Sequence, residues 1–258
     1  MAVDTSPQWD TIEAVDRCLR VIEALKRTDG AGVTELAEEL GWAKSTVHAH
    51  LRTLEANEYV VREEGEYVLG LRFLAFGEYV KHRKPVYSLV EPRLAELAEE
   101  TAERVQFIVP EHGYCVYGRI AEGDRSVSTG GRLGRRREIM HASAAGKAIL
   151  AHLPETTVES ILDRRGMPEL TANTIIDRET LHGELSDVRE RGYALNREEH
   201  IKGLRAVATP VQAPDGTVLG AISVAGPARR MQGERFEEEL PELLLGVRNE
   251  VELDVAHS

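Results

Sequence analysis

The sequence has little cysteine and no long hydrophobic run. Cys18 and Cys115 are the only cysteines among 258 residues, and they fall in two different expected domains, so a disulfide framework is excluded. No Cys/His spacing suggests a structural zinc site, and we expect neither a metal nor a cofactor. No apolar run approaches a membrane span, and the first ten residues lack the basic-then-apolar pattern of a signal peptide. We therefore expect a soluble, cytoplasmic protein with no membrane partner.

Lysine and large aromatic side chains are also scarce. Only six of the 32 basic residues are Lys, aromatic residues make up 5% of the chain, and the formal net charge is −12. Even residues 1–70 carry seven Lys or Arg against 14 Asp or Glu, which is the wrong sign for a simple nucleic-acid binder. Such a composition is typical of a very salty cytosol, where screening shortens charge repulsion to about 3 Å at 1 M salt. The alternative is an ordinary acidic protein.

Two short helices are expected on either side of Gly41. The first, over residues 34–40, ends where a helix C-terminus needs a residue in the left-handed conformation, and Gly41 supplies it. Ser45 and Thr46 are good residues to open the second helix. The pattern predicts a helix-turn-helix, although pairs of packed helices with a glycine between them also occur in bundles that do not bind DNA.

The second helix has an apolar face and a polar face. Val47, Leu51 and Leu54 share one side at 100° per residue. The opposite side is small, polar and partly cationic, which suits a helix in the major groove, where Arg can bond a guanine edge. The candidate DNA-contacting residues are Lys44, Ser45, Thr46, His48, Arg52 and Thr53, with Arg62 reaching phosphates from a wing.

The segments around these helices complete a winged helix. Residues 59–62 and 67–69 are β-rich and flank a turn, which predicts a hairpin. Upstream, Val15, Leu19, Ile22 and Leu25 recur near helical spacing and predict a third core helix. The alternative is a small α+β domain that binds a protein or nothing. We expect disorder over residues 1–10, a winged helix over 11–69, a linker helix over 70–84, and a separate domain over 85–258.

The C-terminal region has a mixed helix and strand pattern, so the fold class is α+β. The linker segment, residues 70–83, carries an apolar surface that needs a partner, either the adjacent domain or another subunit. Beyond it, helices are expected over 89–103, 142–153, 156–165, 177–191 and 234–251, and strands over 105–110, 114–121, 193–197, 206–212 and 218–225. Pro214-Asp215-Gly216 predicts a hairpin turn between the last two strands.

Three stretches of this region resemble the IclR (isocitrate lyase regulator) type of transcription regulator. They are MHASAAGKAILAHLP at 140–154, RERGYALNREEHIKGLRAVATPV at 189–211 and AISVAGP at 221–227. The N-terminal stretches TIEAVDRCLRVIEAL and STVHAHLRTLE are similar too, so the resemblance covers residues 11–251. It implies a winged helix, a linker helix and a GAF-like effector-binding domain, in proteins that assemble as dimers or dimers of dimers.

The resemblance also implies an effector site. The matching positions are Ser143, Ala144, Ala145, Asn196, Leu204, Ala206, Ser223 and Ala225. The start of a helix offers unpaired N–H groups to a carboxylate; close packing of the helix on a sheet would explain the small residues equally well. Asn196 replaces an acidic residue, and Ala206 and Ala225 replace small polar ones. A pocket with these changes favours a sugar acid or a partly apolar metabolite over the smallest keto acids.

The DNA-contacting face departs from the family pattern as well. Ala49 stands where many members have Arg, and His50 stands where they have an apolar residue. The loss of one cation places more of the DNA contact on the remaining polar residues of the helix. His48 and His50 form an H-x-H pair, but they have no neighbouring ligands in the sequence that would complete a metal site.

The function implied is a DNA-binding regulator, repressor or activator of a catabolic gene cluster. Its partners would be double-stranded operator DNA, a small effector (an organic acid, sugar acid or aromatic metabolite) and a second copy. The alternatives are a metabolite-processing enzyme or a ligand-free interaction module fused to a winged helix. No catalytic residue is predicted, because Gly146-Lys147 does not complete a phosphate loop and the sequence contains neither G-x-S-x-G nor HExxH. Glu198 and Glu199, taken as neighbours on a strand, would point to opposite faces and are interpreted as structural or capping carboxylates.

Overall fold

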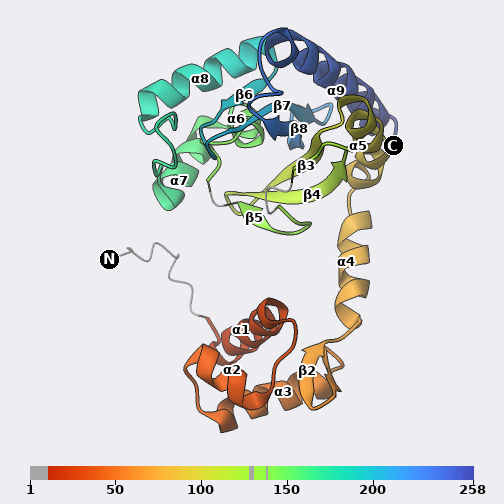
Figure 1. Ribbon diagram of the computed structural model, residues 1–258, viewed down its shortest axis with the longest axis vertical. Helices are drawn as coiled ribbons and strands as arrows, with labels where there is room; N and C mark the ends of the chain where they lie inside the picture. The colour runs from red at the N-terminus through yellow and green to blue at the C-terminus, as the bar shows by residue number, and fades with distance from the viewer. Residues whose placement is uncertain (1–10, 128–130, 138) are drawn as a thin grey trace. The chain divides into compact units, whose positions relative to one another are not determined.

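The chain divides into two compact units, each described here by itself. The computed structural model describes residues 11–127, 131–137 and 139–258, so the segment predicted to be disordered, residues 1–10, lies outside the described residues. The N-terminal unit is Met1–Arg83 and the C-terminal unit is Lys84–Ser258 (Figure 1). None of the described helices is long and apolar enough to cross a membrane.

The N-terminal unit has the elements of a winged helix, as predicted. Its elements are α1 (Glu13–Thr28), α2 (Val33–Leu40), α3 (Lys44–Ala56), β1 (Val60–Glu63), β2 (Glu66–Leu69) and α4 (Arg72–His82). Strands β1 and β2 pair antiparallel. One core cluster joins α1, α2, α3 and the hairpin, and it includes the predicted Val47, Leu51 and Leu54.

Local backbone conformations explain where these elements stop. Gly41 ends α2 with φ 69°, a left-handed conformation that glycine adopts without strain. Glu64 and Gly65 have φ 49° and 99°, so both central residues of the hairpin turn are left-handed, as its tight two-residue loop requires. Helix α3 begins at Lys44, before the predicted Ser45, and its N-cap Ala43 has no side chain that can cap the helix.

The predicted core face of α1 is confirmed for Ile22 and Leu25, which pack in or against the core cluster, and is wrong for Val15 and Leu19. Val15 and Leu19 are about half exposed, and the buried residues are Val21, Ala24 and Leu25. Both sets recur at helical spacing, and periodicity alone does not decide which set faces the core. The apolar face formed by Val15 and Leu19 therefore remains on the surface of the N-terminal unit.

Helix α4 lies in the predicted linker segment and buries none of its residues. Its first half packs on the hairpin base: Tyr59 stacks on Phe76 with ring centroids 6.0 Å apart, and Phe73 lies 5.3 Å from Tyr59. Leu71, Leu74, Tyr79 and Val80 are exposed. Such a row of large apolar side chains indicates a surface with an unassigned partner.

The described part of the C-terminal unit is built on one six-stranded sheet. The helices are α5 (Val86–Thr101), α6 (Ala144–Leu150), α7 (Glu155–Arg165), α8 (Arg178–Arg191), the π-helical turn η1 (Arg235–Glu239) and α9 (Leu240–Ala256). The strands are β3 (Arg104–Glu111), β4 (Tyr114–Glu122), β5 (Arg136–Arg137), β6 (Ala194–Arg197), β7 (Leu204–Gln212) and β8 (Val218–Pro227). The strand order is β5-β4-β3-β8-β7-β6, and neighbouring strands are antiparallel.

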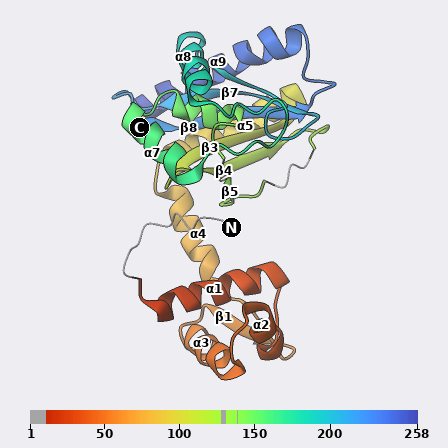
Figure 2. The same cartoon turned by 90° about the vertical axis from the view of Figure 1, so that its left-hand side faces the viewer.

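Two hydrophobic clusters lie on opposite faces of this sheet. Helices α5 and α9 cover one face, and α6, flanked by α7 and α8, covers the other (Figures 1 and 2). On β3, Phe107 belongs to the first cluster and Ile108 to the second, because successive strand residues point to opposite faces. The face under α6 is lined by many alanines, and this is the face that carries the pocket described below.

Candidate functional site

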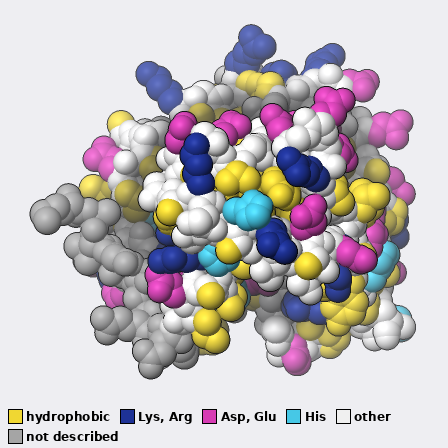
Figure 3. Space-filling view, turned by 90° about the horizontal axis from the view of Figure 1, so that it is seen from below, with side chains coloured by type: hydrophobic (Ala, Val, Ile, Leu, Met, Phe, Trp, Pro, Cys, Tyr) yellow, Lys and Arg dark blue, Asp and Glu magenta, His cyan; other side chains and the backbone are white. Residues whose placement is uncertain are grey.

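Helix α3 presents the predicted DNA-contacting side chains to the surface. Lys44, Ser45, His48, Arg52 and Thr53 are exposed, and Thr46 is half-buried. Figure 3 shows Lys, Arg and His side chains on this lower face, interspersed with Asp and Glu. The face carries charges of both signs together with apolar side chains and is not a uniform basic patch.

Two of the predicted DNA contacts are engaged within the unit. The Thr53 hydroxyl donates a hydrogen bond to the Ala49 carbonyl at 3.0 Å. On the wing, exposed Arg62 lies opposite Tyr67 across the hairpin, with its guanidinium 5.8 Å from the ring centroid. These contacts limit the rotamers of both side chains and leave Lys44, Ser45, His48 and Arg52 as the less constrained members of the face.

A cationic cluster that sequence reasoning missed lies beside the start of α3. The guanidinium groups of Arg17 and Arg20 lie 5.6 and 4.8 Å from the ring centroid of Trp42, one residue before the α3 N-cap. A second contact joins the same two helices: the Cys18 Sγ on α1 is 3.2 Å from His50 Nδ1 on α3. The sequence signal was two arginines three apart on α1, but their contact with Trp42 exists only in the folded unit.

The eight predicted effector residues surround one cavity of about 30 Å³ in the C-terminal unit. It is lined by Gln106, Ile108, Cys115, Ser143, Ala144, Ala145, Asn196, His200, Leu204, Ala206, Ser223 and Ala225. Four of these, Gln106, Ile108, Cys115 and His200, were not predicted. The cavity is small beside the 300–1,000 Å³ of ordinary ligand pockets, so a large ligand requires the walls to move.

Strand register explains which residues reach the cavity. Ser223 lies opposite Gln106 on one side and Ala225 opposite Ala206 on the other. Alternate residues of a strand share a face, so Ser223 and Ala225 both point toward α6. Gln106 could have been found by the same reasoning if the pairing of β3 with β8 had been known, but a single sequence does not show that pairing.

The turn into α6 fixes the floor of the cavity. Ser143 is the N-cap of α6, and its hydroxyl accepts a hydrogen bond from the Gly146 amide at 3.1 Å. A Cβ on Gly146 would lie 2.0 Å from the Met140 carbonyl oxygen, so only glycine fits there. The small Ala144 and Ala145 follow the cap and are buried. Helix packing thus accounts for Gly146, while the two alanines lie on the cavity wall.

Asn196 has a clear structural reason to be an amide. Its Nδ2 donates to the Ala142 carbonyl at 2.8 Å, and its Oδ1 accepts from the Glu199 amide at 3.1 Å. An ionised carboxylate can only accept hydrogen bonds, so Asp would leave the Ala142 carbonyl without this donor. Asn196 therefore connects β6 with the chain that enters α6.

Glu198 and Glu199 do not lie on a strand, so that part of the prediction is wrong. Strand β6 ends at Arg197, and Glu198 has φ 68°. Glu199 is buried and pairs with Lys147 Nζ at 2.8 Å, and Glu198 accepts from the Gly203 amide at 2.8 Å. Both carboxylates have structural partners, which agrees with the interpretation of them as structural or capping groups.

One buried titratable group lies next to this site. His141 is 1% exposed, and burial lowers its pKa, as does the nearby charge of Lys147; a hydrogen bond with the Pro168 backbone opposes them. The imidazole is accordingly held in its neutral form. A neutral His141 beside α6 places no extra positive charge near the cavity.

Comparisons with known proteins agree on one family over both units. The family model "Bacterial transcriptional regulator IclR C-terminal" matches residues 78–251, and the model "IclR helix-turn-helix domain" matches residues 14–64. The chain is 32% identical over 246 residues to the probable HTH-type transcriptional regulator ArcR of Halobacterium salinarum, covering 94% of this chain and 93% of that protein.

Two further matches extend the agreement. The transcriptional repressor IclR of Escherichia coli is 31% identical over 246 residues, 92% of this chain and 88% of the repressor. The crystal structure of the Thermotoga maritima IclR superposes with a TM-score of 0.81 at 26% identity, covering 95% of this chain and 99% of that one. The chain belongs to the IclR family of transcriptional regulators, DNA-binding proteins with an effector domain, and not to a family of enzymes.

Proposed function

We propose that α3 enters the major groove of an operator. Lys44, Ser45, Thr46, His48, Arg52 and Thr53 supply the contacts there, and Arg62 reaches phosphates from the wing. The observation that carries the proposal is the exposed polar face of α3, opposite the buried Val47, Leu51 and Leu54. Arg20, held on Trp42 beside the α3 N-terminus, adds a phosphate contact that offsets the missing Arg at Ala49.

The same proposal assigns the cavity of the C-terminal unit to a small effector. The residues that line it in the described part of the chain include Gln106, Ser143, Asn196 and Ser223, but no Lys, Arg, Asp or Glu. Hydrogen bonds and the backbone amides at the start of α6 would therefore bind the ligand's polar end, and Ile108 and the alanines its apolar part. The cavity of about 30 Å³ is smaller than any organic acid, sugar acid or aromatic metabolite needs, so binding of each requires the walls to move apart.

We further propose that two copies associate through the exposed apolar faces of the N-terminal unit. The residues that form these faces are each more than half exposed: Ile12 at the N-cap of α1, Val15 and Leu19 on α1, and Leu74 and Tyr79 on α4. A dimer places two recognition helices on half-sites of a pseudo-palindromic operator. Leu74→Glu should shift the chain toward monomer in sedimentation experiments, and a dimer of unchanged stability would exclude this face.

The regulatory mechanism we propose is a shift of equilibrium between arrangements of the paired winged helices. Effector binding acts only through its different affinity for those arrangements. We retain the division into a winged helix over 11–69, a linker helix over 70–84 and an effector domain over 85–258. The regulator acts in the cytoplasm, on the operator of a catabolic gene cluster, as repressor or activator.

The first test selects bound fragments of the encoding genome with purified protein in molar KCl. Enrichment of one inverted repeat supports the proposal, and the genes beside it narrow the effector to a pathway. An Arg52→Ala variant serves as the control and should lose the enrichment. If neither low nor high salt enriches any sequence, the proposed operator recognition is wrong.

We also propose adaptation to high salt. The net charge of −12, the six lysines and the similarity to a Halobacterium relative support it. Association of an acidic protein with DNA must take up cations, so the usual steep fall of affinity with salt should be flattened or reversed. The measurement is operator affinity against KCl concentration, and a steep negative slope above 1 M would contradict the proposal.

A further inference from the structure

The segment from Glu198 to Gly203, called here the 198–203 segment, forms one wall of the effector cavity. It joins β6 to β7, contributes His200 to the cavity, and is flanked by the lining residues Asn196 and Leu204. Ile201, Lys202 and Gly203 are exposed, whereas Glu199 points inward and is 5% exposed. The segment therefore supplies His200 to the wall between the lining residues Asn196 and Leu204, while its other end faces solvent.

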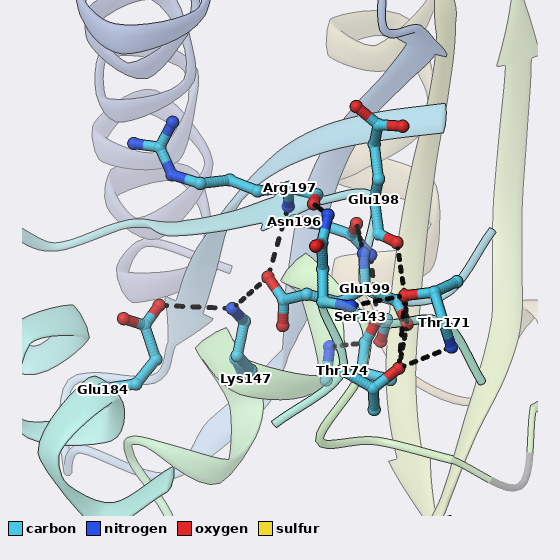
Figure 4. A network of polar contacts seen from close by, with 12 residues as sticks. Ser143, Lys147, Thr171, Thr174, Glu184, Asn196, Arg197, Glu198 and Glu199 are labelled. Atoms are coloured by element: carbon cyan, nitrogen blue, oxygen red, sulfur yellow. Dashed lines mark hydrogen bonds and ion pairs between the residues drawn. The ribbon is translucent and has the colours of Figure 1, made fainter. Parts of the chain in front are cut away.

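The backbone amide, the backbone carbonyl and the side chain of Glu199 all form hydrogen bonds. Its Oε1 accepts from Lys147 Nζ at 2.8 Å and from the Arg197 amide at 3.2 Å. Its amide donates to Asn196 Oδ1, and its carbonyl accepts from Thr174 Oγ1 at 2.6 Å. These partners come from α6, β6 and the connection between α7 and α8, so Glu199 is the point where three elements fix the 198–203 segment (Figure 4).

Lys147 ties this point to the opposite wall of the cavity. It lies on α6, one turn after Ser143, and its amide donates to the Ser143 carbonyl at 2.9 Å. Its side chain is 2% exposed and reaches both Glu199 and Glu184, the latter at 3.2 Å (Figure 4). A buried ammonium persists only with such partners. The ion pair therefore couples the α6 wall of the cavity to the 198–203 segment.

We propose that Lys147 and Glu199 are positioning residues that set the width of the cavity and so the size of ligand admitted. Neither lines the cavity; each acts through the walls it holds. Removing the Lys147 charge leaves Glu199 buried without its main partner, which favours conformations with the 198–203 segment turned out to water. That the admitted ligand is the effector rests on the proposed function; the coupling of the two walls does not.

Cys115 provides a probe inside the cavity. It is 1% exposed and lines the cavity, and the other cysteine, Cys18, can be replaced by Ser. In that background, labelling rates of the folded full-length chain are measured with methyl and benzyl methanethiosulfonate, each normalised to its rate with unfolded chain. The ratio of the two normalised rates reports the size of molecule that reaches Cys115, and hydrogen exchange of residues 197–204 reports the segment itself.

We expect Lys147→Met to raise benzyl labelling about tenfold or more relative to methyl labelling, with faster exchange confined to residues 197–204. Glu199→Gln keeps an oxygen acceptor for Lys147 and the Arg197 amide, so it should stay within about threefold of the parent. Arg178→Gln removes the exposed ion pairs between α7 and α8 and should change neither readout. If Lys147→Met does not fold, Thr174→Val removes the hydrogen bond to the Glu199 carbonyl, together with those that Thr174 Oγ1 accepts from the Leu170 and Thr171 amides, and should give a smaller change in the same direction.

An unchanged size ratio in folded Lys147→Met would overturn the proposal, and so would faster exchange that extends equally into β3. The second result would mean that Lys147 supports the whole C-terminal unit and not this wall. Neither readout uses an effector or DNA. A chain that binds no operator and no metabolite but shows the expected labelling would therefore refute the proposed function while leaving the coupling of the walls intact.

Discussion

The two candidate sites of this chain are built in opposite ways. The proposed DNA face comes from one stretch, residues 44–62, and its side chains are largely exposed. The proposed effector cavity draws on residues from 106 to 225, and most of its side chains are buried. A substitution on the first face changes what the surface offers to DNA, whereas one in the second site also changes the packing of a core.

Because of this difference, residues that serve function and residues that serve stability are separate in the N-terminal unit but overlap in the C-terminal unit. In the N-terminal unit, the core residues and the contact residues of α3 lie on different sides of one helix. In the C-terminal unit, Asn196 both lines the cavity and connects β6 to α6. Substitutions should therefore affect function alone in the first unit and function together with stability in the second.

The largest effect is expected for Gly146→Ala. The new Cβ would lie 2.0 Å from the Met140 carbonyl oxygen, and its three nearest neighbours are backbone atoms of Met140 that cannot move aside. We expect the C-terminal unit to lose about 3 kcal/mol or more. Scanning calorimetry of the full chain measures it as a fall in melting temperature of about 6 °C or more. A change below 2 °C would show that the turn into α6 adapts.

Arg52→Ala should have the next largest effect, on affinity instead of stability. Arg52 is exposed on α3, so its loss should weaken operator binding by about 10- to 100-fold, as expected for a side chain that bonds a base. The melting temperature should not change. Lys26→Ala removes the same charge from the exposed surface of α1 and is the matched control. Equal losses for both variants would mean that only net charge matters.

Acidification should destabilise the C-terminal unit. Burial lowers the pKa of both His141 and His152, with smaller contributions from Lys147 and from Arg189, respectively, opposed in each case by a backbone hydrogen bond. The unfolded chain therefore binds more protons than the folded chain below about pH 6.5. The stabilisation is present above that pH and is lost as pH falls toward the lowered pKa values.

The check is thermal unfolding between pH 7.5 and 5.5, where we expect the melting temperature to fall by about 2–4 °C. His152→Gln should flatten this dependence, because Gln does not titrate. A parent chain with no pH dependence in this range would contradict the argument.

Sequence patterns predicted the buried face of a helix best where the helix has a single apolar face. The burial of Val47, Leu51 and Leu54 follows from helical spacing alone. On α1, helical spacing correctly placed Ile22 and Leu25 on the core side but wrongly included Val15 and Leu19, because apolar residues also recur on the opposite side and tertiary packing buried Val21. The family resemblance predicted eight residues that line one cavity. It did not predict Gln106, because the pairing of β3 with β8 cannot be inferred from the local sequence of either strand.

The buried ion pair between Lys147 and Glu199 could not be predicted from the sequence either, for a different reason. The two residues are separated by 52 positions, and each has the ordinary appearance of a surface charge in its own segment. Only the packing of α6 on the sheet buries Lys147. A local pattern predicts which side of one helix or strand is apolar. A buried ion pair depends on how two separate elements pack together, which a local pattern does not contain.

The smallest effect, and the sharpest contrast with Gly146, is expected for Gly183→Ala. Gly183 lies within α8, and a Cβ there would meet no atom within 4 Å. Alanine restricts the unfolded chain and favours the helix, so the C-terminal unit should gain about 0.5–1 kcal/mol. The same calorimetric experiment should show a rise of about 1–4 °C. The opposite signs of the two substitutions would show that glycine is required in α6 by a backbone contact and is merely tolerated in α8; a loss of stability at Gly183 would instead mean that α8 needs local flexibility.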